Sequence, residues 1–337
     1  MPFIKEILNY KSISFVGMDK NAGKTEALNY VISRLHFFNK KIAVTSIGID
    51  GETLDQVTAT SKPKVFIYPN TLFVTSEKLY DSKQIVSAIV DLSHYATSLG
   101  RLVTAETVSY GNVMLSGPTN SAWLKDLILS FKQKCDICLI DGALSRKSFA
   151  SPSITDAMIL STGAVISGNI EKITDKTKFM YDMTKLPSVS ENMLQKLSNI
   201  EYGIHAVIDK EGNSVDLQIP SLLMLDKYRD KIFSMGKTLY IPGMITDKLL
   251  ELIKMRKNPE EYTLITKDFT HIFSSAVNTR WFLSKGGKIL CLYQTKLLAI
   301  TANPISPLGF KVDNKTMLSS LRENIDLPIY NIRDIDL

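Results

Sequence analysis

An apolar segment, a short loop and a helical segment follow one another near the start of the chain, and this succession constrains the fold most. Residues 12–17 are mostly apolar, and residues 26–38 carry apolar side chains at helical spacing. The loop between them ends in Gly23, Lys24 and Thr25. A second apolar segment, residues 42–48, follows the helical one. The pattern predicts a βαβ unit with a right-handed crossover, whose first loop lies at the carboxyl end of a strand.

Gly-Lys-Thr between a strand and a helix is typical of a loop that binds the phosphates of a nucleotide. Backbone N–H groups of the loop and of the helix start donate to phosphate oxygens. Lys24 adds a positive charge for the β- and γ-phosphates, and the Thr25 hydroxyl is a ligand for Mg²⁺. A chance Gly-Lys-Thr at a helix start is the alternative. The residues expected to surround the nucleotide are Gly17, Asp19, Asn21, Ala22, Gly23, Lys24, Thr25 and Gly142.

An acid at the end of a later apolar strand is the second feature of the predicted site. Residues 135–140 are apolar apart from Asp136 and end on Asp141, followed by Gly142. An acid at this position holds Mg²⁺ directly or through water, opposite Thr25, and the small Gly142 lets a phosphate or water approach. The alternative is an ordinary Asp-Gly turn at a strand end. We expect Lys24 and Asp141 to be catalytic, and Thr25 and Asp141 to bind the metal.

A third acid, Asp50, follows the second strand of the βαβ unit directly. Ligands of open α/β sheets meet the loops at the carboxyl ends of strands, so Asp50 is a candidate to orient an attacking water or to ligate Mg²⁺. Glu52 is the substitute candidate, and a plain Asp-Gly turn is about as plausible. Glu106, at the end of another apolar segment, either points into the same cleft or is an ordinary edge residue.

The base of the nucleotide is only weakly indicated. GTPases with such a phosphate loop recognise guanine with Asn/Thr-Lys-x-Asp after a strand. Here Thr266, Lys267 and Asp268 follow one another without the intervening residue. We therefore expect ATP with Mg²⁺ and keep GTP as possible.

Composition excludes several other classes of function. The chain has 337 residues, and 40 basic and 34 acidic residues give a net charge of +6. No basic run with interleaved aromatic residues predicts nucleic-acid binding, no apolar stretch is long enough to span a membrane, and no leader segment is evident. Three cysteines fit a cytoplasmic protein. Cys135 and Cys138 lie in the apolar strand, which favours structural burial over metal or redox use.

Strands and helices alternate along the chain, which predicts an α/β fold with a doubly wound, mostly parallel sheet. We expect a nucleotide-binding domain over residues 1–190 and a smaller α/β domain over residues 200–337. The pattern also predicts a helix over 79–95 and a hairpin of 102–108 with 112–116. In the second half it predicts a strand over 221–224 and one helix over 269–284.

The loop departs from the common phosphate-loop pattern. The first glycine of that pattern is replaced by Met18, and Gly17 lies one residue earlier. This longer form resembles the branch that holds dethiobiotin synthetase, MinD-like ATPases and nitrogenase iron protein. The synthetase loop is the most similar, with Gly17, Asp19 and Gly23-Lys24-Thr25 in register and Asn21 where the synthetase has glycine. In MinD-like proteins, an acid at the position of Asp50 orients the attacking water or ligates Mg²⁺, and the resemblance implies the same role for Asp50.

Longer stretches, residues 47–52, 140–152, 155–164 and 300–309, resemble the nucleotide-binding subunit associated with reactivation of lysine 5,6-aminomutase. The similarity covers most of the chain. It implies an ATPase that reactivates or chaperones an adenosylcobalamin-dependent aminomutase of lysine fermentation, together with a second reactivase subunit. No Asp-x-His-x-x-Gly motif is present, so cobalamin would belong to the partner.

Two other functions remain open at this point. One is a small-molecule ligase or kinase of the dethiobiotin synthetase type. The other is a nucleotide-binding regulator with little turnover, which Met18 in place of glycine makes plausible.

Overall fold

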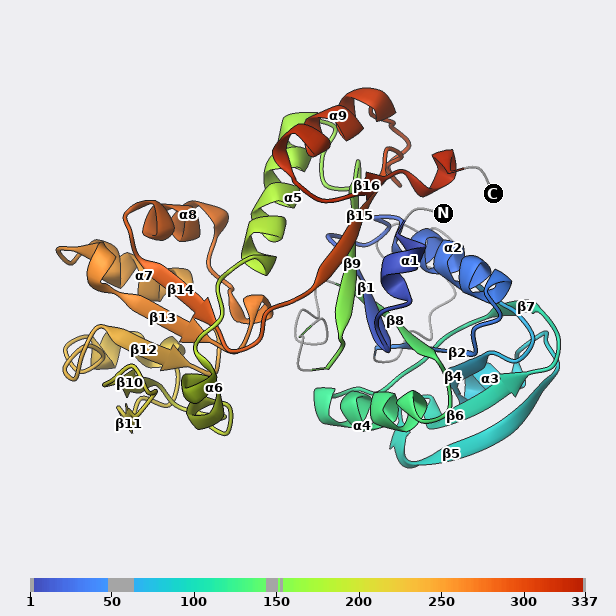
Figure 1. Ribbon diagram of the computed structural model, residues 1–337, viewed down its shortest axis with the longest axis horizontal. Helices are drawn as coiled ribbons and strands as arrows, with labels where there is room; N and C mark the ends of the chain where they lie inside the picture. The colour runs from blue at the N-terminus through green and yellow to red at the C-terminus, as the bar shows by residue number, and fades with distance from the viewer. Residues whose placement is uncertain (1–2, 48–63, 144–150, 152–153, 336–337) are drawn as a thin grey trace. The chain divides into compact units, whose positions relative to one another are not determined.

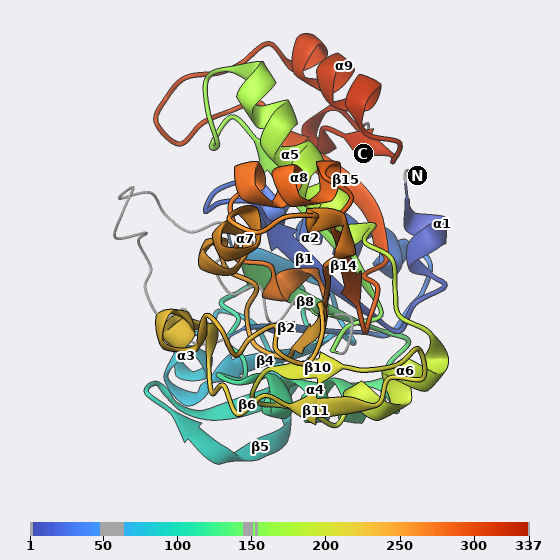
Figure 2. The ribbon, with the colours of Figure 1, turned by 90° about the vertical axis from the view of Figure 1, so that its left-hand side faces the viewer.

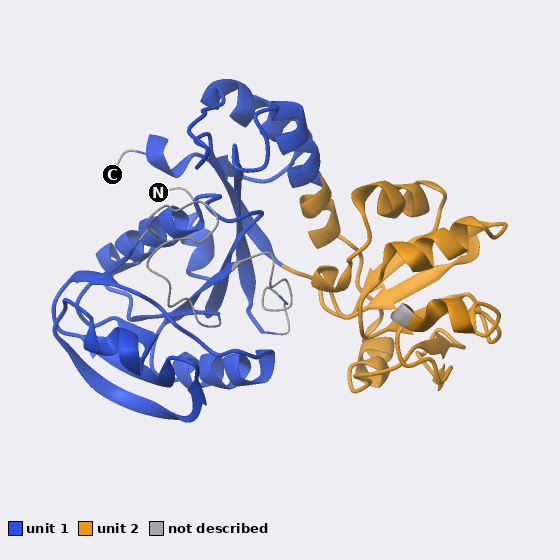
Figure 3. Cartoon of the chain, turned by 180° about the vertical axis from the view of Figure 1, so that it is seen from behind, with its two compact units in different colours: residues 1–178, 296–337 blue, residues 179–295 orange. Residues whose placement is uncertain are grey.

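The computed structural model describes residues 3–47, 64–143, 151 and 154–335. The chain forms two compact units (Figure 3): unit 1 holds residues 1–178 and 296–337, and unit 2 holds residues 179–295. The expected division between residues 190 and 200 therefore differs from these units. The chain leaves unit 1 within a helix, α5 (Ile170–Thr184), and its last segment returns to unit 1.

Unit 1 is built on a sheet of nine strands among the described residues (Figure 1). Their order is β16-β15-β9-β1-β8-β2-β4-β6-β5. The strands from β16 to β4 are parallel, and β6 and β5 are antiparallel additions. The fold is thus α/β with a mostly parallel sheet, as expected. The bounds are β1 (Ser12–Gly17), β2 (Ile42–Ser46), β4 (Leu72–Ser76), β5 (Ser87–Thr97), β6 (Gly100–Thr107), β8 (Ile137–Ala143), β9 (Ala157–Gly163), β15 (Leu297–Asn303) and β16 (Ile329–Tyr330).

Helices cover both faces of this sheet (Figures 1 and 2). α1 (Ile4–Ile7) and α2 (Lys24–Phe37) pack on one face, in a core that includes Phe15 and Ile159. α4 (Ser121–Lys132) packs on the other face, over Cys138 and Ile140. Alternate residues of the central strands therefore enter two separate cores, which is why these strands are apolar almost throughout. The remaining elements of unit 1 are α3 (Glu77–Asp81), α9 (Asn314–Asn324), η5 (Ile332–Asp334) and a two-stranded sheet of β3 (Val65–Ile67) and β7 (Gly111–Val113).

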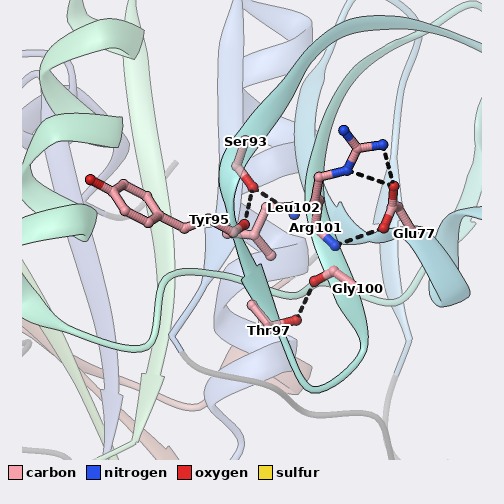
Figure 4. Close-up of polar contacts among 7 residues, drawn as sticks. All are labelled: Glu77, Ser93, Tyr95, Thr97, Gly100, Arg101 and Leu102. Atoms are coloured by element: carbon pink, nitrogen blue, oxygen red, sulfur yellow. Dashed lines mark hydrogen bonds and ion pairs between the residues drawn. The ribbon is translucent and has the colours of Figure 1, made fainter.

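The helix expected over 79–95 is wrong, because α3 ends at Asp81 and the long edge strand β5 follows. The hairpin expected from 102–108 and 112–116 is also wrong. β6 pairs with β5 and β4, whereas β7 pairs with β3. Polar contacts hold the real hairpin (Figure 4): Ser93 Oγ accepts from the Leu102 N–H at 2.9 Å, and Glu77 pairs with Arg101 at 2.8 Å.

Unit 2 has a smaller sheet of order β11-β10-β12-β13-β14, in which β12, β13 and β14 are parallel. The strand expected over 221–224 is wrong, since this region is the 3₁₀ helix η2 (Leu222–Tyr228). The helix expected over 269–284 is divided into η4 (Phe269–His271) and α8 (Ala276–Ser284), because Asp268 and Ser275 each cap a new helix start. The other bounds are β10 (His205–Val207), β11 (Ser214–Asp216), β12 (Thr238–Ile241), β13 (Thr263–Thr266), β14 (Lys288–Cys291), α6 (Glu191–Leu197), α7 (Asp247–Lys254) and η3 (Pro259–Glu261).

None of the helices in the described part of the chain combines the length and the apolar character needed to cross a membrane.

Candidate phosphate-binding site

The loop of residues 17–25 joins β1 to α2 at the carboxyl edge of the large sheet. β1 lies between β8 and β9, and all three strands are parallel, so their carboxyl ends meet at this edge. Gly17 allows the chain to fold back on itself. A Cβ atom there would lie 3.0 Å from the carbonyl oxygen of Asp19 and 3.5 Å from the Cβ atom of Ala22. A side chain at this position would therefore open the loop.

Two loop residues have left-handed backbone conformations, Asn21 with φ 61° and Gly23 with φ 91°. Glycine adopts this region without cost, and asparagine is among the few other residues that visit it routinely. Asn21 is therefore compatible with the conformation that glycine would give.

Contacts within the loop and to a neighbouring strand fix its course. The Met18 N–H donates to the carbonyl oxygen of Ser161 at 2.8 Å, which ties the loop to β9. The exposed Asp19 carboxylate accepts from the Lys20 N–H at 2.7 Å. Asp19 therefore caps the loop in this structure. Ala22 is buried beneath the loop.

Lys24 and Thr25 lie in the first turn of α2, whose N-cap is Gly23. Gly23 provides no side-chain cap for the helix, and the first N–H groups of any helix lack an intrahelical partner. The positive end of a helix of 14 residues also favours an anion. Glu26, in the same turn, pairs with Arg333 of η5. The helix start is thus suited to phosphate oxygens.

Asp141 lies in β8, opposite Phe15 of β1 and Ser46 of β2. The structure brings it together with Lys24: the Lys24 Nζ atom lies 2.7 Å from Asp141 Oδ1. Both side chains are mostly buried, with 24% of Lys24 and 16% of Asp141 exposed. Although the distance is short, the buried Oδ1 atom accepts no hydrogen bond of proper geometry, so the contact is chiefly ionic. Such an oxygen retains lone pairs for a metal ion.

Gly142 is buried, and close packing accounts for the absence of a side chain. A Cβ atom there would lie 3.0 Å from the Ile47 Cδ1 atom and 3.5 Å from the carbonyl oxygen of Phe15. Its proposed proximity to a phosphate stays a prediction. Asp50 and its substitute Glu52 lie outside the described residues, so the expected catalytic role of Asp50 also stays a prediction.

Asn303, at the carboxyl end of β15, was not recognised from the sequence as part of this site. A Cβ atom on Gly23 would lie 3.2 Å from the Asn303 Cβ atom, so Asn303 packs against the loop of residues 17–25. Its Oδ1 atom accepts from the Ile305 N–H at 3.1 Å. The signal that could have revealed it is an Asn-Pro pair directly after an apolar strand, which marks a strand end at the edge where ligands bind.

Two other candidates have local roles. Glu106 lies opposite Leu72, at the amino end of β4, and pairs with Lys41 at 2.9 Å. It is therefore on the opposite edge of the sheet from the loop of residues 17–25, as an ordinary edge residue.

Asp268 belongs to unit 2, where its buried carboxylate accepts from the Thr270 N–H at 2.8 Å and begins η4. A structural role thus accounts for the acid of the Thr-Lys-Asp sequence.

Both cysteines of the apolar strand region are buried, as expected. Burial raises the pKa of the Cys135 thiol to about 11 and also raises the pKa of Cys138. The Cys135 thiol donates to the carbonyl oxygen of Phe131 at 3.1 Å. Both groups are thiols at neutral pH, which suits packing rather than nucleophilic use.

No protein family, curated protein or solved structure was found to match this chain.

Proposed function

We propose that unit 1 is a P-loop NTPase that binds a nucleoside triphosphate with Mg²⁺ and hydrolyses it. The observation that carries the proposal is the approach of Lys24 to Asp141 at 2.7 Å, at the carboxyl edge shared by β1 and β8. A cation at a helix start and an acid at the adjacent strand end are the two charges that a metal–triphosphate complex requires. The mostly parallel sheet and the compact loop around Gly17 and Gly23 support the same proposal.

Different residues of the site would contact the phosphates, the metal ion and the attacking water of such a ligand. Loop N–H groups and Lys24 would bind the phosphates and hold them in one orientation. Thr25 and Asp141 would hold Mg²⁺, and the Oδ1 atom of Asp141, which accepts no hydrogen bond of proper geometry, suits that role. When bound, Mg²⁺ neutralises charge that develops on the phosphate oxygens. Asp50 is proposed to orient the attacking water. ATP is the proposed nucleotide, with GTP as the alternative.

The proposed use of hydrolysis is reactivation of a partner enzyme. Its support is the resemblance of residues 140–152 and 300–309 to the nucleotide-binding subunit of the lysine 5,6-aminomutase reactivase. Radical enzymes lose their adenosyl group in side reactions and retain inactive cobalamin in a closed complex. Binding and hydrolysis of a nucleotide can bias such a complex toward an open state. We propose an adenosylcobalamin-dependent aminomutase as the partner and a second reactivase subunit as its companion.

The decisive assay is hydrolysis of MgATP and MgGTP by the purified chain, with and without lysine 5,6-aminomutase that has been inactivated by turnover. The proposal predicts that the inactivated mutase stimulates hydrolysis by the wild-type chain and regains its own activity. With the Lys24→Ala variant, neither the stimulation nor the recovery should occur. Turnover without stimulation would favour a ligase or kinase of the dethiobiotin synthetase type. Tight binding without turnover would favour a regulator.

A further inference from the structure

We propose that Lys24 and Asp141 form a latch that keeps the phosphate site closed to nucleotide until a divalent cation arrives with it. This inference rests on the proposed function, because it assigns a regulatory role to two groups of the same site. The two groups that would bind the phosphates and the metal bind each other in this structure, 2.7 Å apart.

The latch joins a helix start and a strand end at the carboxyl edge of the sheet. Lys24 extends from the first turn of α2, and Asp141 lies in β8 beside β1. Two other acids of the loop and helix start, among the residues that the structure describes, have partners of their own: Glu26 pairs with Arg333, and Asp19 accepts from the backbone of the loop. Among the described carboxylates, Lys24 is therefore directed to Asp141.

Partial burial makes separation of this pair costly. With 24% and 16% of the side chains exposed, each charge has lost much of its contact with water. A charge that loses its partner in such a place is poorly compensated, so breaking a buried pair is more costly than breaking a surface pair. Whatever opens the latch must therefore supply a new partner to Lys24 and a new partner to Asp141.

Only a metal–nucleotide complex supplies both partners. A metal-free nucleotide offers phosphate oxygens to Lys24 but leaves the Asp141 carboxylate facing another anion. A divalent cation alone offers a partner to Asp141 but leaves the Lys24 ammonium beside a second cation. Because each ligand removes the penalty that opposes the other, the latch couples their binding. Such couplings between two ligands typically amount to about 5- to 150-fold in affinity.

The test is the Asp141→Asn variant in the absence of metal, where the latch predicts an effect opposite to simple loss of a ligand. Asparagine keeps the shape of aspartate but cannot hold Lys24 by charge. Metal-free ATP, titrated in EDTA with calorimetry, should therefore bind this variant about ten-fold more tightly than wild type. Added Mg²⁺ should strengthen ATP binding much less in the variant than in wild type.

The matched control is Asp126→Asn, which removes the same charge from the exposed surface of α4 and should leave both affinities unchanged. Unchanged or weaker metal-free binding by Asp141→Asn, while wild type binds MgATP, overturns the latch and leaves the nucleotide site standing. Absence of MgATP binding by wild type, or equal binding by Lys24→Ala, overturns the proposed function as well.

Discussion

At the residue scale, Gly23 shows how a backbone conformation and a close neighbour act together. Its φ of 91° lies in the left-handed region, and Asn303 occupies the space where its side chain would extend. We expect Gly23→Ala to lower the free energy of unfolding by about 1–2 kcal/mol and to weaken MgATP binding, since the loop must shift. Urea denaturation and calorimetry measure the two effects.

The control for that substitution is Gly243→Ala in unit 2, where a Cβ atom would meet no atom within 4 Å. If Gly23→Ala changes stability and affinity no more than Gly243→Ala does, the conformation of the loop is not critical to the site.

Asp156 gives a prediction about pH. Burial raises the pKa of its carboxyl, but hydrogen bonds from Lys132 and Ser12 outweigh burial and hold that pKa below its ordinary value. A carboxyl with a lowered pKa stabilises the fold above its unfolded-state pKa, and this stabilisation is lost as pH falls through the folded-state pKa. Asp156→Asn should therefore cost about 1 kcal/mol at pH 7, an amount reduced by partial exposure, and less below about pH 4.

Denaturation of both proteins at pH 7 and pH 3 tests that prediction. A difference that is equal at the two pH values would show that the carboxylate charge of Asp156 is not what stabilises the native state.

The approach of Lys24 to Asp141 could be predicted from local features of the sequence. Lys24 and Asp141 stand at the ends of recognisable segments, and parallel strands bring such ends to one edge. The sequence could place Asn303 at a strand end but could not predict its contact with Gly23, because that contact depends on the position of β15 two strands from β1. Spacing along the chain carries no information about that position.

At the element scale, the segment that becomes β5 shows the limit of periodicity. Ile85, Ile89 and Leu92 have helical spacing, yet the segment pairs with β6 as an edge strand. This edge strand lacks the strict alternation of apolar and polar side chains that a strand with one buried face shows. Two bulges, at Ile89/Asp91 and Leu92/Ala96, interrupt the alternation further. Pairing with β6 therefore outweighs the local pattern, and sequence alone does not reveal the pairing.

In α4, by contrast, a local residue determines where the element begins, because a capping residue directly precedes the helix. The Asn120 side chain accepts from the Trp123 N–H at 2.9 Å and caps the helix. We expect Asn120→Ala to lower the free energy of unfolding by about 1 kcal/mol, and Asn120→Ser to retain most of the stability, because serine also caps well. Urea denaturation of the three proteins measures this. Equal losses in both variants would contradict a capping role.

At the scale of the whole molecule, the return of the last segment to unit 1 was the main feature missed. Residues 296–337 add β15 and β16 to the large sheet, and β15 pairs with β9 beside β1. The sequence pattern could suggest a boundary between residues 190 and 200, but it could not indicate that the chain returns to the first unit. Long-range strand pairing, rather than a linker, defines the first unit.

That arrangement makes the last segment essential to unit 1. A chain that ends at residue 295 would expose the edge of β9 and lose the buried residues Leu298 and Ile300. We expect it to lose cooperative unfolding and MgATP binding, whereas a chain that ends at residue 335 should retain both. Circular dichroism during denaturation and calorimetry compare them. Normal MgATP binding by the shorter chain would contradict the sheet order described above.

The most direct test of the central claim is a calorimetric titration of MgATP into wild type and the Lys24→Ala variant. The claim is that the loop ending in Lys24, together with Asp141, forms a metal–nucleotide site at the carboxyl edge of the sheet. It predicts saturable binding by wild type and no measurable binding by Lys24→Ala in a folded protein. Equal affinities in the two proteins would contradict it.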